Sequence, residues 1–162
     1  MVWSDWIALV ALALSVVDFL WLYIVRGRRP VFRVLIAHQS GFEGRKRHVC
    51  KVMALNRSSE PFYISSVQLV FAGKLPIEGS FSAKKIGDLN GDPIMSTPFP
   101  INLDGYQGKA CLIEFWIPKD ISVSERDPFS LTFDTSRGKL ASSTFFLTIS
   151  EFSLDLLREL RC

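Results

Sequence analysis

The densest group of basic side chains in the chain lies at residues 44–48, with the sequence Gly-Arg-Lys-Arg-His. Positive charges packed this closely can bind a small anionic ligand such as a nucleotide, or an acidic partner. Short basic runs are also common in solvated loops, and that interpretation stays open. The sequence marks the run as a candidate anionic-ligand or partner loop, made up of Arg45, Lys46, Arg47 and His48.

Other chemical motifs are incomplete. Residues 88–92 resemble the beginning of an EF-hand loop, but Pro93 stands at the sixth position and Phe99 at the twelfth, where calcium binding needs Gly and Glu. His38 and His48 are the only imidazoles, and neither lies in a recognisable nucleophile motif. We therefore expect no metal, no cofactor and no enzymatic activity.

The three cysteines, Cys50, Cys111 and Cys162, are too scattered for a zinc site. An immunoglobulin-type disulfide would place a Trp between the two cysteines and a Tyr two residues before the second, and neither is present. Cys50 and Cys111 lie in apolar runs, where a thiol acts as a small hydrophobic side chain. We expect free thiols, as in a reducing compartment.

Residues 1–29 organise the rest of the chain. An almost unbroken apolar run extends from Trp6 to Val25, and twenty helical residues span about 30 Å, the thickness of a bilayer's hydrocarbon core. A cleaved signal peptide would carry basic residues before the run and a small-residue cleavage site after it, and the sequence has neither. The pattern predicts a transmembrane anchor.

The basic residues that flank the anchor all follow it, at Arg26, Arg28 and Arg29. Because positive residues stay on the cytoplasmic side, the N-terminus is expected outside and residues 30–162 in the cytoplasm. These three arginines would also contact anionic lipid headgroups.

One carboxylate interrupts the apolar run, at Asp18. A charge at this depth is costly unless it is paired, protonated or reached by water. Helical spacing places it on one stripe with three small residues, the arrangement that helices use for close contacts in membranes. The stripe of Ala8, Ala11, Ser15 and Asp18 predicts self-association or a partner helix, and a merely tolerated Asp18 is the alternative.

The remainder is expected to be one mainly β domain over residues 30–150, followed by a short amphipathic helix at 151–162. Strands are predicted at 31–37, 47–56, 62–71, 109–117, 129–134 and 140–149, with a loop at 38–46. Phe32, Val34 and Ile36 should share one face of the first strand, and Val67, Leu69 and Phe71 should share one face of the third. The side chains expected to point inward are those of Cys50, Val52 and Ala54 and those of Cys111, Ile113, Phe115 and Ile117, with Glu114 outward. Short strands separated by frequent turns favour an immunoglobulin-like β-sandwich, with a small β-barrel as the second choice.

Charge excludes one class of partner. The 162 residues carry 19 Lys and Arg against 16 Asp and Glu, and three of the arginines lie beside the apolar run. The domain is close to neutral, so no nucleic-acid polymer is expected as a partner.

The turn Asn56-x-Ser58-x-x-Pro61-x-x-Ile64, followed by Val67-x-Leu69, resembles a pattern found in small bacterial single-pass membrane proteins with an immunoglobulin-like domain. The hairpin at residues 134–139 looks similar to theirs. These motifs form turns and carry no catalytic residues. The resemblance therefore implies the fold and a location in the bacterial envelope, at the inner membrane, but no activity.

Two functions remain as hypotheses. The first is a membrane-tethered, non-enzymatic protein-interaction module that associates through its helix. The second is a ligand-gated membrane effector, in which the basic loop senses a small anionic ligand and the helices rearrange around Asp18.

Overall fold

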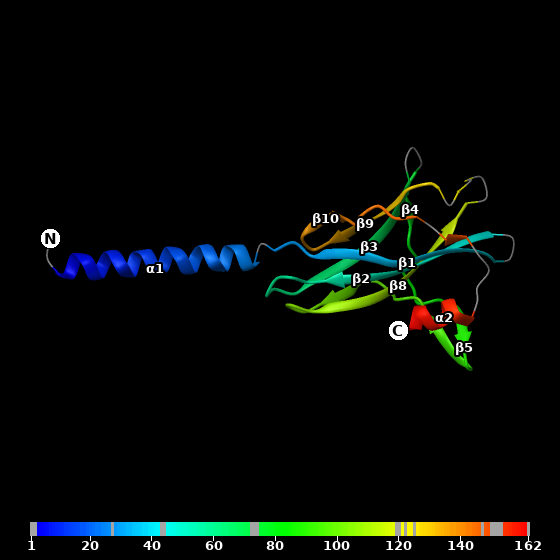
Figure 1. Cartoon of the computed structure of the whole chain (residues 1–162), viewed down its shortest axis with the longest axis horizontal. Coiled ribbons are helices and arrows are strands. Elements are labelled where there is room, and N and C mark those ends of the chain that lie inside the picture. The colour runs from blue at the N-terminus through cyan, green and yellow to red at the C-terminus, as the bar shows by residue number, and fades with distance from the viewer. Residues whose placement is uncertain are drawn as a thin grey trace.

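The computed structural model describes residues 3–26, 28–42, 45–71, 75–118, 121, 123–124, 126–146, 148–149 and 154–161. The chain is mainly β, with an apolar helix at its N-terminus and a short helix near its C-terminus, as predicted. Figure 1 shows the N-terminal helix projecting away from one end of the β domain.

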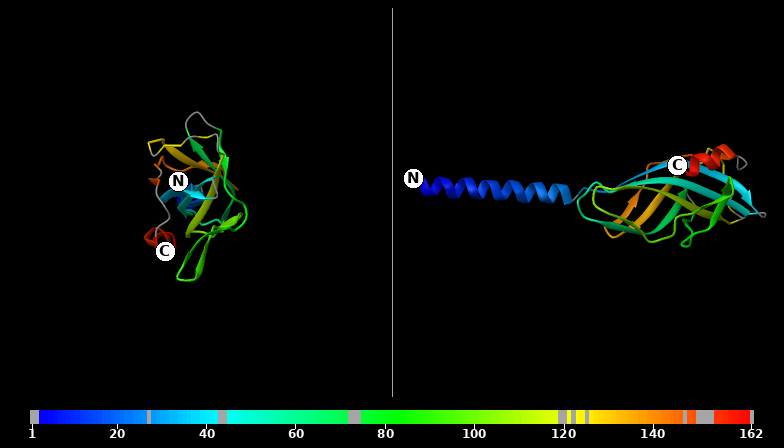
Figure 2. Two further views of the ribbon diagram at one scale, coloured as in Figure 1. Left: turned by 90° about the vertical axis from the view of Figure 1, so that its right-hand side faces the viewer. Right: turned by 90° about the horizontal axis from the view of Figure 1, so that it is seen from below.

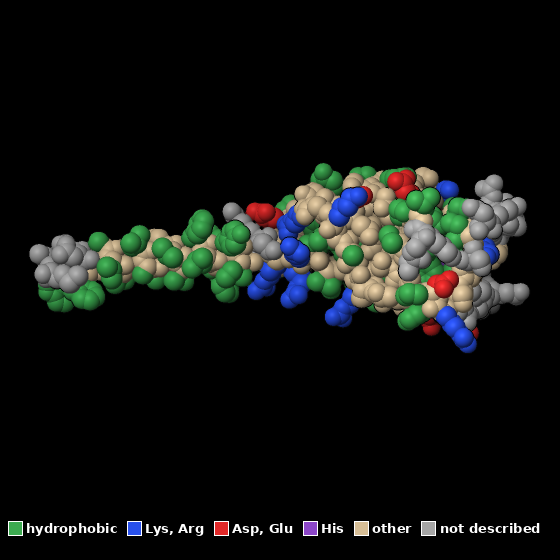
Figure 3. All heavy atoms as spheres, turned by 90° about the horizontal axis from the view of Figure 1, so that it is seen from above, with side chains coloured by type: hydrophobic (Ala, Val, Ile, Leu, Met, Phe, Trp, Pro, Cys, Tyr) green, Lys and Arg blue, Asp and Glu red, His purple; other side chains and the backbone are tan. Residues whose placement is uncertain are grey.

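The N-terminal helix α1 (Trp3–Arg26) is long and apolar enough to cross a membrane over Trp6–Ile24. None of that span is buried in the rest of the protein, so α1 is not the core helix of a soluble domain. A signal sequence near the N-terminus can meet the same criteria of length and apolar composition. Figure 3 shows apolar side chains along α1, with Lys and Arg side chains where it meets the domain.

The strands form two main sheets. The first sheet has the order β11-β1-β2-β8 and contains β1 (Val31–Phe42), β2 (Arg45–Leu55), β8 (Gly108–Ile117) and β11 (Thr148–Ile149). The second sheet has the order β10-β9-β3-β4, and β7 also pairs with β3. It contains β3 (Phe62–Phe71), β4 (Ile77–Glu78), β7 (Ile101–Leu103), β9 (Phe129–Thr135) and β10 (Gly138–Ala141).

The main core lies between these two sheets, because alternate residues of β2, β3, β8 and β9 point into it. Ile113 and Phe115 of β8 meet Leu69 of β3 and Leu131 of β9 in this core. Phe32 stacks on Phe133 at 4.0 Å between ring centroids. The inward positions predicted for β2, β3 and β8 are confirmed.

A second core covers the outer face of the first sheet, the face turned away from the main core. Here the hairpin of β5 (Lys85–Leu89) and β6 (Asp92–Met95) lies beside helix α2 (Leu154–Arg161), as Figures 1 and 2 show. Its buried members are Val49 of β2, Ile86, Leu89 and Ile94 of the hairpin, and Leu157 and Leu160 of α2. The first sheet is therefore covered on both faces.

The hairpin at β5–β6 turns at Asn90 and Gly91, whose φ angles are 54° and 88°. Positive φ at both central residues is the two-residue turn that matches the twist of paired strands, and Asn-Gly is its strongest sequence signal. The run that resembles an EF-hand loop is thus a β-turn.

Two details of the predicted strands are wrong. The expected loop at 38–46 is mostly strand, because β1 and β2 stay paired out to Phe42 and Arg45. The register also shifts between Val34 and Ile36, and such a bulge moves the following side chains to the opposite face. Ile36 consequently packs in the second core rather than beside Phe32.

A buried Asx turn connects β2 to β3 at the end of the domain next to α1. The Oδ1 atom of Asn56 accepts hydrogen bonds from the backbone N–H and the hydroxyl of Ser58, at 3.1 and 2.9 Å. Its Nδ2 atom donates to the carbonyl groups of Glu60 and Asp104. Gly105 fits against this turn because a Cβ there would lie 2.2 Å from the carbonyl oxygen of Ser59.

Candidate functional site

The small-residue stripe of α1 is fully accessible. The side chains of Ala8, Ala11, Ser15 and Asp18 are all exposed. The Ser15 hydroxyl donates to the carbonyl oxygen of Ala11 at 2.9 Å, so its hydrogen bond is made within the helix. Ala8 and Ala11 carry no polar side-chain atoms, so the stripe can offer a neighbouring helix the Ser15 hydroxyl oxygen as an acceptor and the carboxyl group of Asp18.

The three arginines that follow the apolar span of α1 differ in their surroundings. Arg26 is the last residue of α1, and its side chain is outside the described part of the structure. Arg28 and Arg29 are exposed. The guanidinium of Arg137, at the turn between β9 and β10, donates to the carbonyl oxygen of Arg28 at 3.4 Å and to that of Glu60 at 2.8 Å. This contact ties the segment after α1 to the body of the domain.

The basic run at 45–48 forms the beginning of β2 rather than a loop. Lys46 is half-buried, Arg47 and His48 are buried, and the side chain of Arg45 lies outside the described residues. Successive strand residues point to opposite faces. Arg47 therefore points to the outer face of the first sheet and His48 to the main core, so the two do not line a common surface.

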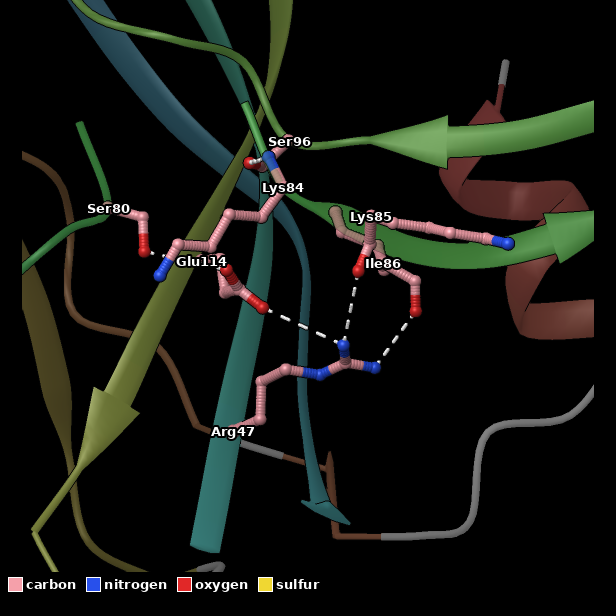
Figure 4. A network of polar contacts seen from close by, with 7 residues as sticks. All are labelled: Arg47, Ser80, Lys84, Lys85, Ile86, Ser96 and Glu114. Carbon is pink, nitrogen blue, oxygen red and sulfur yellow. Dashed lines mark hydrogen bonds and ion pairs between the residues drawn. The ribbon is translucent and has the colours of Figure 1, made fainter. Parts of the chain in front are cut away.

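Arg47 is the centre of a buried polar network that holds the β5–β6 hairpin on the first sheet (Figure 4). Its Nη2 atom donates to the carbonyl oxygen of Ile86 at 2.9 Å, and Nη1 lies 3.5 Å from that of Lys85. Nη1 also lies 3.6 Å from Oε1 of Glu114, whose side chain is 1% exposed. Burial lowers the pKa of Arg47, and the carboxylate of Glu114 opposes that shift.

Glu114 lies on the outward face of β8, as predicted, and it is nevertheless buried there. The residue does lie opposite the inward side chains of β8, but the segment at 79–97 covers it. The backbone N–H of Ser80 donates to the carbonyl oxygen of Glu114 at 2.9 Å, and the Ser80 hydroxyl approaches Oε2 at 3.4 Å. Alternation along a strand specifies a face but not whether another element covers it.

His48 is enclosed in the main core. Its Nε2 atom is hydrogen-bonded to Oε1 of Gln39, and its ring meets the Phe129 ring edge-on at 5.9 Å between centroids. Burial, with smaller contributions from the charges of Lys46 and His38, lowers the pKa of His48 to about 3. The imidazole is therefore neutral at physiological pH and has a packing role.

Helix α2 is attached to the same outer face through polar contacts as well as its leucines. Lys51 of β2 donates from Nζ to the carbonyl oxygen of Glu159 at 2.6 Å. Arg161 forms an ion pair with Asp92 of β6 at 2.8 Å. Both contacts join elements that are distant in sequence, so no local pattern predicts them.

The described residues contain no group of three or more His, Cys, Asp or Glu that could hold a metal ion. The chain matches no known protein family and no curated protein.

Cys50 and Cys111 are buried free thiols on the adjacent strands β2 and β8. Burial raises the pKa of Cys50 to about 12 and that of Cys111 to about 11. We expect Cys50 to react with iodoacetamide in the folded protein about a thousandfold more slowly than an exposed thiol, because thiolate is the reactive form. Peptide mass spectrometry before and after unfolding measures this, and rapid labelling of the folded chain would contradict it.

Proposed function

We propose that this chain is a single-pass membrane protein whose β domain is a non-enzymatic protein-interaction module. The N-terminus lies outside and the domain lies at the cytoplasmic face of the bacterial inner membrane. Copies of the chain associate through α1. The observation that carries the proposal is the complete exposure of Trp6–Ile24, because an apolar helix of this length is stable only when lipid or other helices cover it.

The strand order supports an immunoglobulin-like sandwich. The neighbours β1, β2 and β8 correspond to strands A, B and E of that fold, and β3, β9 and β10 correspond to C, F and G. Immunoglobulin-like domains commonly serve as recognition modules at cell surfaces, but fold alone specifies no partner.

A packing role for the reactive side chains supports the non-enzymatic part of the proposal. His48, Cys50 and Cys111 are enclosed in the main core. Arg47 binds Glu114 and the β5–β6 hairpin, so it serves the domain's own structure. The ligand-gated alternative needs the 45–48 run as a sensor, and these contacts favour the interaction module over it.

We expect Asp18→Leu to weaken self-association of the full-length chain by about threefold to thirtyfold, the range of one hydrogen bond between membrane helices. Ala11→Leu should weaken it as well, since the larger side chain separates the helices. Ala13→Leu is the matched control, because residue 13 lies on the opposite side of α1. Energy transfer between labelled chains in micelles measures association. Equal association of all the variants would refute assembly through this stripe.

The orientation has a separate test. A protease added outside intact spheroplasts should leave the β domain uncut, and should digest it once the membrane is permeabilised. Digestion before permeabilisation would refute the cytoplasmic placement, and a soluble full-length chain without detergent would refute the membrane span.

A further inference from the structure

A basic cavity lies where the chain leaves α1 and enters the domain. It has a volume of about 300 Å³ and is lined by the segment at 28–30 and by the β9–β10 hairpin. Four cationic side chains line it, those of Arg28, Arg29, Arg137 and Lys139. The two segments are more than one hundred residues apart in sequence, so the cavity is a product of the tertiary fold.

Of the cationic side chains that line the cavity, one is held in place by hydrogen bonds and the others remain available to bind a ligand. Arg137 is held by its bonds to the carbonyl groups of Arg28 and Glu60, and its guanidinium lies 5.6 Å from the centroid of the Phe62 ring. Lys139 is 3.7 Å from the Asp134 carboxylate, and its side chain is 72% exposed, so this ion pair neutralises it weakly. The side chains of Arg28 and Arg29 make no hydrogen bond or ion pair with any other described residue.

The distance of the cavity from the apolar span indicates which kind of anionic ligand it is placed to bind. Arg28 lies four residues after Ile24, the end of the apolar span. Four residues cover about 6 Å as a helix and at most about 14 Å when extended. The headgroup layer on each side of a bilayer is roughly 5–8 Å thick. A cavity at this distance from the span lies at the depth of lipid phosphates.

We propose that this cavity binds the phosphate of an anionic phospholipid headgroup in the adjoining leaflet, which seats the β domain on the membrane. The proposal rests on the proposed function, because it needs α1 to span the bilayer. Arginine pairs with phosphate through parallel N–H donors, and Arg28 and Arg29 supply donors that no other residue in the described part of the chain uses. Lys139 adds a point charge from the opposite wall.

The test uses the full-length chain in micelles containing equal amounts of phosphatidylglycerol and phosphatidylcholine with the same acyl chains. Native mass spectrometry counts the lipids retained on each chain, so any preference for phosphatidylglycerol reports the headgroup. The double variant Arg29→Gln/Lys139→Gln should reduce that preference about twenty-fivefold, at roughly fivefold for each basic residue removed. Both substitutions leave the contacts of Arg137 in place.

The matched control is Arg57→Gln/Lys109→Gln, which removes the same two residue types. These side chains are exposed and do not line the cavity. They nevertheless lie at the same end of the domain, within two residues of Leu55 and Gly108. Leu55 and Gly108 are the paired ends of β2 and β8, next to the beginning of β1. The control should retain the wild-type preference. An equal loss in both double variants would show a diffuse basic surface and overturn the proposal.

Two further measurements separate the remaining outcomes. Glycerol 1-phosphate at millimolar concentration should not displace phosphatidylglycerol, and displacement would assign the cavity to a soluble phosphate instead of a lipid. Resistance of each variant to alkaline carbonate extraction from vesicles reports whether α1 spans the bilayer. Extraction of the wild type would refute the membrane span, whereas retention without headgroup preference would refute the cavity proposal alone.

Discussion

Glu114→Leu is expected to destabilise the β domain by about 3–5 kcal/mol, the cost of leaving a buried charge without its partner. Arg47 is 5% exposed and would keep its positive charge beneath the β5–β6 hairpin without the Glu114 carboxylate to neutralise it. Arg47→Met should cost a similar amount, since it leaves the buried Glu114 carboxylate without its cationic partner. It also removes the hydrogen bonds that hold Lys85 and Ile86.

The double variant Arg47→Met/Glu114→Leu should recover most of this loss, because apolar side chains of similar volume can replace a buried ion pair. We expect it to lie within about 1–2 kcal/mol of the wild type, the residual cost being the hydrogen bonds that Arg47 no longer donates to the carbonyl groups of Lys85 and Ile86. Recovery in the double variant would identify charge pairing, rather than lost packing, as the cause of the single-variant losses.

The measurement is denaturant unfolding of the full-length chain in mild detergent, followed by the circular dichroism of the sheets. Asp88→Asn is the control, because Asp88 pairs with Lys85 at 2.7 Å in an ion pair whose side chains are 51% and 56% exposed. Breaking an exposed pair costs about 1 kcal/mol or less. Losses as small as this in the Glu114→Leu and Arg47→Met variants would contradict the structural role of the network.

The second large effect concerns pH and His48. The unfolded chain protonates this imidazole near its ordinary pKa of 6.5, whereas the folded chain does so only at about 3. Between these values the unfolded state binds one more proton, so stability falls as the pH falls. The slope is about 1.4 kcal/mol per pH unit, which amounts to roughly 3 kcal/mol at pH 4.5. Above pH 6.5 this contribution is complete and constant.

His48→Gln isolates this contribution, because an amide at that position does not titrate and reaches as far as Nε2 does toward Gln39. The variant will be less stable at pH 7 if the imidazole packs better on Phe129, so the comparison is between slopes and not between absolute stabilities. We expect the wild type to lose about 3 kcal/mol more than the variant between pH 7 and pH 4.5. Parallel curves would show that His48 is protonated in the folded domain.

Local sequence patterns predicted much of the secondary structure of this protein and many of the residues in its core. The apolar run of α1 and the alternation in β3 and β8 are periodic signals that a single strand or helix carries by itself. The pairs Cys50–Val52 and Ile113–Phe115 point inward as their spacing indicates. Asn90-Gly91 is also the sequence signal of a hairpin turn, and the structure has this turn between β5 and β6.

The positions and burial of the candidate site residues could not be predicted from local patterns in the same way. Arg45, Lys46, Arg47 and His48 are one basic run in the sequence, but the strand sends Arg47 and His48 to opposite faces. Whether the outer face of β2 is solvated depends on the hairpin and α2 covering it, and their contacts come from residues 38 to 108 positions away. The basic cavity beside α1 likewise needs the β9–β10 hairpin to return beside Arg28 and Arg29.

The sequence by itself determined the apolar helix, its basic flank and the alternating strands, because hydrophobic periodicity acts within one element. Only the tertiary structure decided which polar residues are buried, and which cations lie together near the apolar helix. The physical reason is that burial and electrostatic environment are set by packing between elements distant in sequence, and periodicity within one element carries no information about that packing.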